Sequence, residues 1–202
     1  LEILDSMAAP RSNEYGRADR AAAWMLLAKI YLNAEVYTGT SRYADVITYT
    51  NNIIGAGYTI PTIPYFHSFL ADNDSNGAQE EVIFTIPFDG LRTQAFGGMT
   101  FLTHAPVGGS MNPSDFGING GWFGIRTTPT FVEKFPGEEN SNDGRELLYT
   151  DGQNKDILTV STFTDGYAIA KYRNVDVNGN PGSDTTGDHT DIDFPMFRLA
   201  DA

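Results

Sequence analysis

The feature that most constrains this chain is one stretch, residues 17–31, with the periodicity of an α-helix. Four of its residues recur at i, i+3, i+4 and i+7 and therefore share one helical face: Trp24, Leu27, Ala28 and Tyr31. Between residues 21 and 32 only Lys29 is charged. A helix that is apolar nearly all round is buried on more than one face, so the sequence predicts a core helix that needs several packing neighbours.

A second helix is expected to pack against the first. The first helix should begin after Asp19, whose carboxylate can accept from unpaired N–H groups, and end near Asn33. The second should begin after Ser41 and end at Gly55 or Gly57. The residues expected to share its apolar face are Tyr43, Ala44, Ile47 and Ile54. The W-x2-L-x-x-x-Y spacing of the first helix matches a tetratricopeptide repeat, with alanine in place of glycine.

After residue 60 the periodicity is lost and glycine, proline, asparagine and aromatic residues become frequent. We expect a strand over 81–87, a short helix over 128–135 that begins at a proline, and extended or paired segments at 158–163 and 167–172. The predicted fold class is mainly α, with a tetratricopeptide-like helical part over 1–60 and a loop-rich, ligand-binding part with short β-strands over 61–202.

The charge and residue content exclude several classes of function. The net charge is −13, and the 13 lysines and arginines are scattered, which argues against a nucleic-acid partner. Cysteine is absent, so disulfides, thiol nucleophiles and cysteine-ligated metals are excluded. No stretch of 18 apolar residues is present.

An enzyme is not expected. His67, His104 and His189 lack zinc-site spacing, and the G-x-S-x-G nucleophile motif does not occur. A glycosidase needs only two carboxylates, and sequence spacing leaves that alternative open.

Seven short segments, in one order along the chain, resemble the SusD/RagB family of bacterial outer-membrane glycan-binding lipoproteins. They are residues 16–32, 43–47 with 57–58, 80–84, 121–129, 135 with 143–145, 171–173 and 193–202. Members of this family are several hundred residues long, so the chain is expected to be a middle portion of one. The other packing partners of the first helix, and the lipid-anchor cysteine with its signal, would then lie outside residues 1–202.

The resemblance implies a function and a location. Proteins of this family capture an oligosaccharide at the cell surface without catalysis and deliver it to a SusC-like TonB-dependent transporter in the outer membrane. The expected partners are therefore a glycan and this transporter, and the expected location is the surface of the outer membrane. Two alternatives remain: a tetratricopeptide-type protein-interaction scaffold without a sugar ligand, and a structural lattice or adhesin component.

Trp122 is the main candidate for binding the glycan, because an aromatic ring on a glycine-rich loop can stack against a sugar ring. The alternative is a structural tryptophan that anchors its loop in the core. The remaining candidates are Asn119, Asn112, Asp115 and Phe116. The three polar residues are also typical of ordinary turns. Phe116 is individually more typical of a core, as are Phe96, Phe101, Tyr65 and Phe66.

Residues 72–77, with the sequence DNDSNG, match the opening of a calcium loop. An EF-hand loop has glutamate at its twelfth position, and here that position is Ile83, so the segment is not an EF-hand. Calcium held by Asp72, Asp74 and Glu80 is the one cofactor hypothesis, and some members of the resembled family carry calcium in this part of the chain. The alternative is a solvated turn, and no cofactor is expected to be required.

Overall fold

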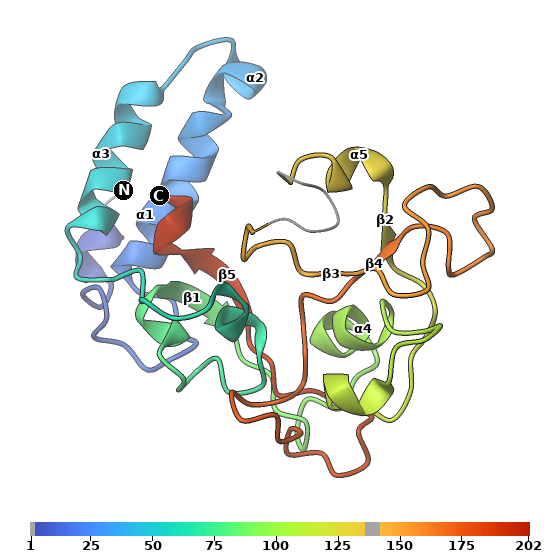
Figure 1. Ribbon diagram of the computed structural model, residues 1–202. Coiled ribbons are helices and arrows are strands. Elements are labelled where there is room, and N and C mark those ends of the chain that lie inside the picture. The colour runs from blue at the N-terminus through green and yellow to red at the C-terminus, as the bar shows by residue number, and fades with distance from the viewer. Residues whose placement is uncertain (1–2, 136–141) are drawn as a thin grey trace. The chain divides into compact units, whose positions relative to one another are not determined.

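The structure is a computed structural model that describes residues 3–135 and 142–202, and it divides into two compact units (Figure 1). Unit 1 comprises Leu1–Thr62, Gly77–Ile86 and Pro195–Ala202, and unit 2 comprises Ile63–Asn76 and Pro87–Phe194. The first boundary lies close to residue 60, where the sequence pattern changes. The segments 77–86 and 195–202, however, belong with the helices.

Unit 1 is built on a helical hairpin, as the sequence predicted. Helix α1 spans Arg20–Leu32, the short α2 spans Ala34–Thr38, and α3 spans Tyr43–Ile54. Helices α1 and α3 pack along each other (Figure 1). Gly39 ends α2 with a φ of 72°, a left-handed conformation that glycine adopts without a steric penalty.

Asp19 ties the start of α1 to the rest of unit 1, which confirms its predicted capping role. Its Oδ1 accepts from the N–H groups of Ala21 and Ala22 at 2.8 and 3.2 Å. Its Oδ2 accepts from the Arg11 N–H at 2.8 Å and the Tyr58 hydroxyl at 3.3 Å. The side chain is only 4% exposed, so these four donors take the place of water around a buried carboxylate.

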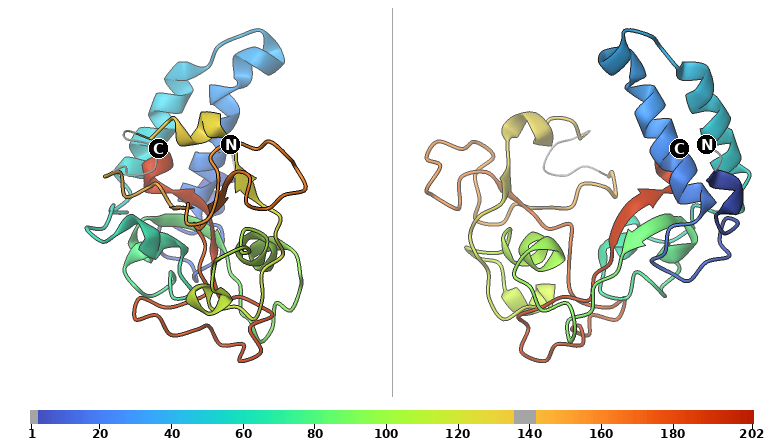
Figure 2. Two further views of the ribbon diagram at one scale, coloured as in Figure 1. Left: turned by 45° about the vertical axis from the view of Figure 1, so that its right-hand side comes forward. Right: turned by 180° about the vertical axis from the view of Figure 1, so that it is seen from behind.

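A two-stranded sheet lies beside the helices of unit 1. Strand β1 (Val82–Ile86) pairs with β5 (Phe194–Arg198), and the two run side by side in every view (Figure 2). Short 3₁₀ helices cover Leu4–Ser6, Ala78–Glu80 and Leu199–Asp201. The buried core joins residues of the hairpin to one residue of β1: Ala21, Ala22, Met25, Ile53, Tyr58 and Ile83.

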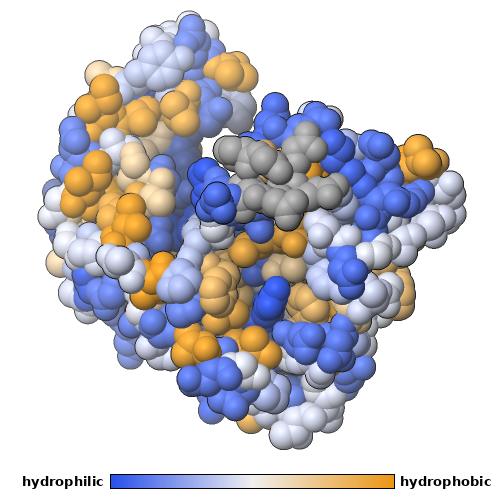
Figure 3. All heavy atoms as spheres, in the orientation of Figure 1, coloured by the Kyte–Doolittle hydropathy of each residue, from blue (hydrophilic) through white to orange (hydrophobic). Residues whose placement is uncertain are grey.

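The helices of unit 1 also leave apolar side chains in solvent, and these gather on the surface of the hairpin (Figure 3). On α1, Leu26, Ile30 and Leu32 are each at least 50% exposed, so within the described residues this helix is not buried on every face. On α3 Ile53 is buried, whereas all four residues of the expected apolar face are exposed within the described residues: Tyr43, Ala44, Ile47 and Ile54.

Unit 2 is loop-rich and contains a small sheet. Strands β2 (Arg126–Thr127), β3 (Leu148–Tyr149) and β4 (Tyr167–Ile169) form it in the order β2-β4-β3, and both pairings are antiparallel. The helices are α4 (Gly98–His104) and α5 (Pro129–Val132), and 3₁₀ helices cover Tyr65–Phe69 and Pro113–Phe116. The core of this unit consists of Val107, Met111, Phe116, Ile118, Ala168 and Ala170.

Several sequence predictions for element boundaries are confirmed and two are wrong. The strand predicted over 81–87 is β1, and the short helix entered through Pro129 is α5. The segment 158–163 is not a strand: Leu158 and Val160 are 84% and 80% exposed, and β4 pairs with β2 and β3 instead. The cap of α3 is Arg42 instead of Ser41.

The fold class is confirmed as mainly helical with a loop-rich part. The alternation of apolar residues identified β1 but could not identify two-residue strands such as β2 and β3, which are defined only by their pairing with β4. In the described part of the chain, no helix has the length and apolar character needed to cross a membrane.

Replacing Asp19 by alanine is expected to lower the free energy of unfolding by about 2 kcal/mol, because it removes a helix cap and leaves buried donors unpaired. Denaturant unfolding monitored by circular dichroism measures the change. Asp19→Asn keeps one acceptor oxygen and should lose less. Equal stability of Asp19→Ala and the unsubstituted chain would contradict this role.

Candidate functional site

The candidate site is the loop after residue 120, and the C-terminal end of α4 holds it in place. The last carbonyl groups of a helix have no partner inside the helix. The Trp122 N–H donates to the His104 carbonyl at 3.0 Å, and the Phe123 N–H donates to the Val107 carbonyl at 3.1 Å. The next two N–H groups, at residues 124 and 125, both donate to the Ala105 carbonyl, at 2.7 and 2.9 Å. Four consecutive backbone donors therefore fix this loop.

This close approach of two backbones requires glycine at position 121. A Cβ atom built on Gly121 would overlap the carbonyl group of Val107. At the neighbouring Gly120, a Cβ atom would meet nothing within 4 Å. Phe123 has a φ of 56°, which is uncommon for a residue other than glycine, and its ring packs edge-on against Phe163 with centroids 5.4 Å apart.

The Trp122 ring lies in a cluster of aromatic side chains. It stacks on the imidazole of His104, with ring centroids 4.8 Å apart and an angle of 23° between the planes. Phe96 and Phe101 lie beside it at 6.3 and 6.1 Å, tilted by 56° and 49°. Phe96 also meets His189 edge-on at 5.2 Å. We call Phe96, Phe101 and Trp122 the aromatic platform.

All three rings of the aromatic platform remain open to solvent. Trp122 is 39% exposed, Phe101 is 44% exposed and Phe96 is 64% exposed. Exposed aromatic side chains that gather in one place form an apolar surface of the kind that binding sites use. Trp122 therefore combines features of both hypotheses: its backbone anchors the loop, and its ring offers surface to a ligand.

His104 supports the platform as a neutral imidazole. It is buried, and its Nδ1–H donates to the Gly120 carbonyl at 2.7 Å. Burial lowers the pKa of His104 below its ordinary value, because the charged form would lose its hydration. The ring beneath Trp122 is therefore uncharged at neutral pH, and it stacks as a flat, uncharged surface.

The three polar candidates form hydrogen bonds with other residues of the chain. Asn112 caps the 3₁₀ helix Pro113–Phe116 by accepting from the Ser114 N–H, and its amide donates to Asp115 at 3.2 Å. Asn119 donates to the Asp188 carboxylate at 2.7 Å, and this hydrogen bond is the main cause that lowers the pKa of Asp188. All three are exposed; the hydrogen bonds of Asn112 and Asp115 are those of turn residues, whereas Asn119 links two segments far apart in the chain.

The aromatic residues are distributed differently from the sequence-based expectation. Phe116 is 3% exposed and packs in the core of unit 2, with the Arg173 guanidinium 5.1 Å from its ring, so it has no free face for a sugar. Phe96 and Phe101, which were expected in the core, are instead the neighbours of Trp122. Gly97 and Gly98, which directly follow Phe96, are the sequence signal that could have placed Phe96 on an exposed turn, whereas Phe101 lies within α4.

The carboxylates that were predicted to bind calcium form hydrogen bonds or ion pairs with other groups of the protein. Asp72 accepts from the Asn76 amide at 3.0 Å and from the Val177 N–H at 3.2 Å. Glu80 forms an ion pair with Arg11 at 2.6 Å. Within the described ranges, no group of three or more histidine, cysteine or acidic side chains is arranged to hold a metal ion. Calcium at Asp72, Asp74 and Glu80 stays a prediction.

Comparison with known proteins shows that this architecture is similar to that of SusD-type proteins. The starch-binding protein SusD of Bacteroides thetaiotaomicron is 34% identical over an alignment of 245 residues, which covers 100% of this chain and 44% of that protein. The chain thus spans less than half the length of this relative. No family model matches the chain.

Two solved structures share the fold. A SusD superfamily protein from Parabacteroides distasonis has a TM-score of 0.63 at 20% identity, over 96% of this chain and 40% of that structure. Surface glycan-binding protein A from Bacteroides uniformis has a TM-score of 0.56 at 15% identity, over 98% and 40%. The resemblance to the SusD family is confirmed: the whole chain matches part of a SusD protein, and its fold is SusD-like.

Two adjacent glycines test how the loop is held. Gly121→Ala is expected to lower the free energy of unfolding by about 3 kcal/mol, because its Cβ overlaps the Val107 carbonyl. Gly120→Ala is the matched control and should change stability by less than about 1 kcal/mol, since its Cβ enters open space. Chemical denaturation measures both, and acrylamide quenching of tryptophan fluorescence reports whether Trp122 moves. Similar losses in the two variants would contradict the close approach.

Lowering the pH should destabilise the chain through His104. Its pKa in the folded state lies below the ordinary 6.5, so the unfolded chain binds the proton more readily. Stability is then fully present above about pH 6.5 and falls as the pH drops through the folded pKa, by at most about 1.4 kcal/mol per pH unit. Unfolding measured between about pH 7.5 and about pH 5 should show this slope. It should be lost in His104→Gln and kept in His67→Gln; an unchanged slope in His104→Gln would refute the assignment.

Proposed function

We propose that the protein binds an oligosaccharide, without catalysis, through the aromatic platform. The observation that carries this proposal is the gathering of three partly exposed rings, from Phe96, Phe101 and Trp122, over a buried neutral histidine. A pyranose ring presents a face of C–H groups, and burying that face against an aromatic ring removes apolar surface from water.

The loop that carries Trp122 supports recognition of a rigid ring. Binding is stronger when the receptor is ordered before the ligand arrives, because less conformational freedom is lost. The four backbone hydrogen bonds from residues 122–125 to carbonyl groups at and after the end of α4, and the stack on His104, hold the indole in place in the unliganded chain. Trp122 therefore needs little reorganisation to receive a sugar.

The similar proteins support the same class of ligand. The curated relative is named as a starch-binding protein, and one structural relative is named as a surface glycan-binding protein. From these we infer that the ligand is a glycan, that the protein works at the surface of the outer membrane, and that it delivers the glycan to a SusC-like TonB-dependent transporter. Neither name describes an enzyme, which supports binding without catalysis.

The structure gives less support to a repeat scaffold. Such a scaffold needs further helical hairpins at a spacing of about 34 residues. In the described residues, unit 1 holds one hairpin, and the helices of unit 2 have only seven and four residues. We therefore propose ligand binding in unit 2 in preference to a scaffold function.

Titration with maltoheptaose, xylohexaose and inulin-type oligosaccharides tests the platform. Trp24 is only partly buried, so the titration is done in a Trp24→Phe background, where the fluorescence reports Trp122. One sugar class should give a saturable shift. Phe96→Ala should weaken the binding by roughly fivefold, since an aromatic contact contributes about 1 kcal/mol. In the same background Trp122→Ala leaves no tryptophan to report binding by fluorescence, so this variant is measured by calorimetry. It should show no binding.

The matched control is Phe66→Ala, which removes a ring that is 41% exposed and pairs with His67 instead of Trp122. It should bind as the unsubstituted chain does. Equal losses in Phe66→Ala and Phe96→Ala, or no binding of any sugar by a folded chain, would overturn the proposal. Self-association without sugar binding would favour the lattice alternative instead.

A further inference from the structure

Unit 2 contains a further concave surface, a cavity of about 360 Å³ between two segments of the chain. This volume is in the range of small-ligand pockets. One wall consists of the 3₁₀ helix Pro113–Phe116 with the residues that follow it, and the other wall is the segment 181–187. The polar side chains that line the cavity are Ser114, Asn119, Asp184, Thr185 and Thr186. Because three of them carry hydroxyl groups, we call it the hydroxyl-lined cavity.

Hydrogen bonds hold the two walls of this cavity together. The Asn119 N–H donates to the Gly187 carbonyl at 3.1 Å. A Cβ atom built on Gly187 would lie 2.8 Å from the Asn119 nitrogen, so this approach needs glycine. The fully buried Asn174 amide bonds to both segments, since it donates to the Gly117 carbonyl at 3.1 Å and to the His189 carbonyl at 3.3 Å. The cavity is therefore formed before a ligand arrives, which favours binding.

The exposed polar groups of the cavity are uncharged. Ser114, Asn119 and Thr185 are exposed, and the side-chain hydroxyls of Ser114 and Thr185 form no hydrogen bond within the described part of the chain. A hydroxyl group both donates and accepts, and a side-chain amide has two donors and an acceptor oxygen. A sugar residue carries several hydroxyl groups with the same double capacity. The cavity thus matches a polyhydroxyl ligand.

The charge in the cavity wall disfavours an anion. Among the described lining residues Asp184 is the one charged side chain, and it is buried. It accepts from the Thr186 hydroxyl at 2.7 Å and from the N–H groups of Thr186 and His189 at 2.9 and 3.0 Å. These hydrogen bonds, with that of the Thr186 hydroxyl the largest cause, lower the pKa of Asp184 below its ordinary value. The carboxylate is therefore ionised at neutral pH and repels acidic sugars.

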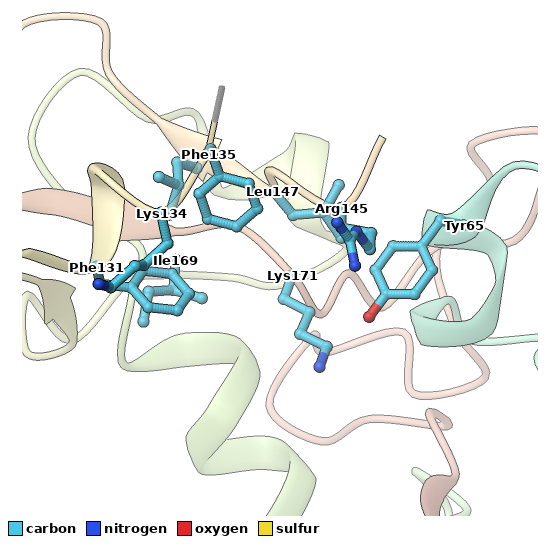
Figure 4. Close-up of a pocket in the computed structure, with 9 residues that line it drawn as sticks. Tyr65, Phe131, Lys134, Phe135, Arg145, Leu147, Ile169 and Lys171 are labelled. Atoms are coloured by element: carbon cyan, nitrogen blue, oxygen red, sulfur yellow. The ribbon is translucent and has the colours of Figure 1, made fainter. Parts of the chain in front are cut away.

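The lining differs from that of another cavity in unit 2, which Figure 4 shows. That cavity has lysine, arginine, tyrosine and phenylalanine side chains in its walls. The hydroxyl-lined cavity has neither a cation nor an aromatic ring among the described residues that line it. Binding there would depend on hydrogen bonds, whereas the aromatic platform offers apolar ring faces. The two surfaces therefore suit different parts of a sugar, its hydroxyl groups and its C–H face.

Both walls of the cavity lead directly to the aromatic platform. Trp122 follows Asn119 by three residues, and His189 follows Thr186 by three residues. The His189 ring meets the Phe96 ring of the platform, with centroids 5.2 Å apart. Three residues of chain span at most about 11 Å. An oligosaccharide of a few residues covers such a distance, so one glycan chain can reach both surfaces.

We propose that the hydroxyl-lined cavity is a second subsite, which takes a neutral sugar residue of the glycan chain that stacks on the aromatic platform and bonds its hydroxyl groups to Ser114, Asn119 and Thr185. That the ligand is a glycan rests on the proposed function, whereas the preference for a neutral, hydroxyl-rich residue follows from the lining of the cavity. The protein then selects for length, because a disaccharide occupies the platform alone and a longer oligosaccharide occupies both surfaces.

Calorimetry with a short and a long form of each neutral sugar tests the subsite: maltose and maltoheptaose, xylobiose and xylohexaose, sucrose and inulin-type oligosaccharides. The double variant Ser114→Ala, Thr185→Val removes two hydroxyl groups and breaks no hydrogen bond between described residues. It should weaken the long form by roughly tenfold, since each lost hydrogen bond costs severalfold in affinity, and leave the short form unchanged. Tetragalacturonate should bind less tightly than maltotetraose.

The matched control is the double variant Thr159→Val, Ser161→Ala, which removes the same two groups from exposed residues outside the cavity. It should bind every probe as the unsubstituted chain does. Equal losses of the long form in the two double variants, or no loss in Ser114→Ala, Thr185→Val, would overturn the subsite. Tighter binding of tetragalacturonate than of maltotetraose would also overturn it.

The two proposals fail in different ways. Phe96→Ala should weaken short and long forms alike, because both contact the platform. If the long form depends on Phe96 but not on Ser114 and Thr185, the cavity is not a subsite and the aromatic platform stands. If the long form depends on Ser114 and Thr185 but is unaffected by Trp122→Ala, the platform is refuted and the cavity binds sugar by itself. Failure of all oligosaccharides to bind would refute both.

Discussion

The site in unit 2 depends on one backbone interaction, the hydrogen bonding of residues 122–125 to the carbonyl groups at and after the end of α4. The acceptors are the His104 carbonyl at the end of the helix and the Ala105 and Val107 carbonyls that follow it, and this loop supplies the donors. The two backbones can approach only because residue 121 has no side chain. The position of the Trp122 ring over His104 follows from this contact, and Phe96 and Phe101 complete an exposed aromatic surface around it.

The aromatic platform of unit 2 lies on a neutral histidine, and we propose that it receives the C–H face of a sugar. Because the imidazole of His104 is buried and uncharged, it adds a flat ring beneath Trp122 without adding a charge to the surface that the ligand would meet.

The accuracy of the sequence-based predictions follows from the range of the interactions involved. Asp19 and the bounds of α1, α3 and β1 were predicted well, because caps and periodicity act over a few residues. The periodicity of α3 did not single out Ile53, the residue of this helix that is buried, because which apolar side chain is covered depends on packing with other segments. Phe96 and Phe101 were assigned to a core because an aromatic residue in an irregular segment gives no local indication of its exposure.

The sequence by itself determined the helical hairpin, the acidic character, the absence of thiol chemistry, the choice of Trp122 as the main candidate and the resemblance to the SusD family. Each of these is a property of single residues or of spacings that can be counted along the chain. Only the tertiary structure decided which rings surround Trp122, that Phe116 is buried, and that residues 114–119 and 181–187 line one cavity. These features depend on contacts between segments far apart in the chain, which the order of residues does not reveal without the fold.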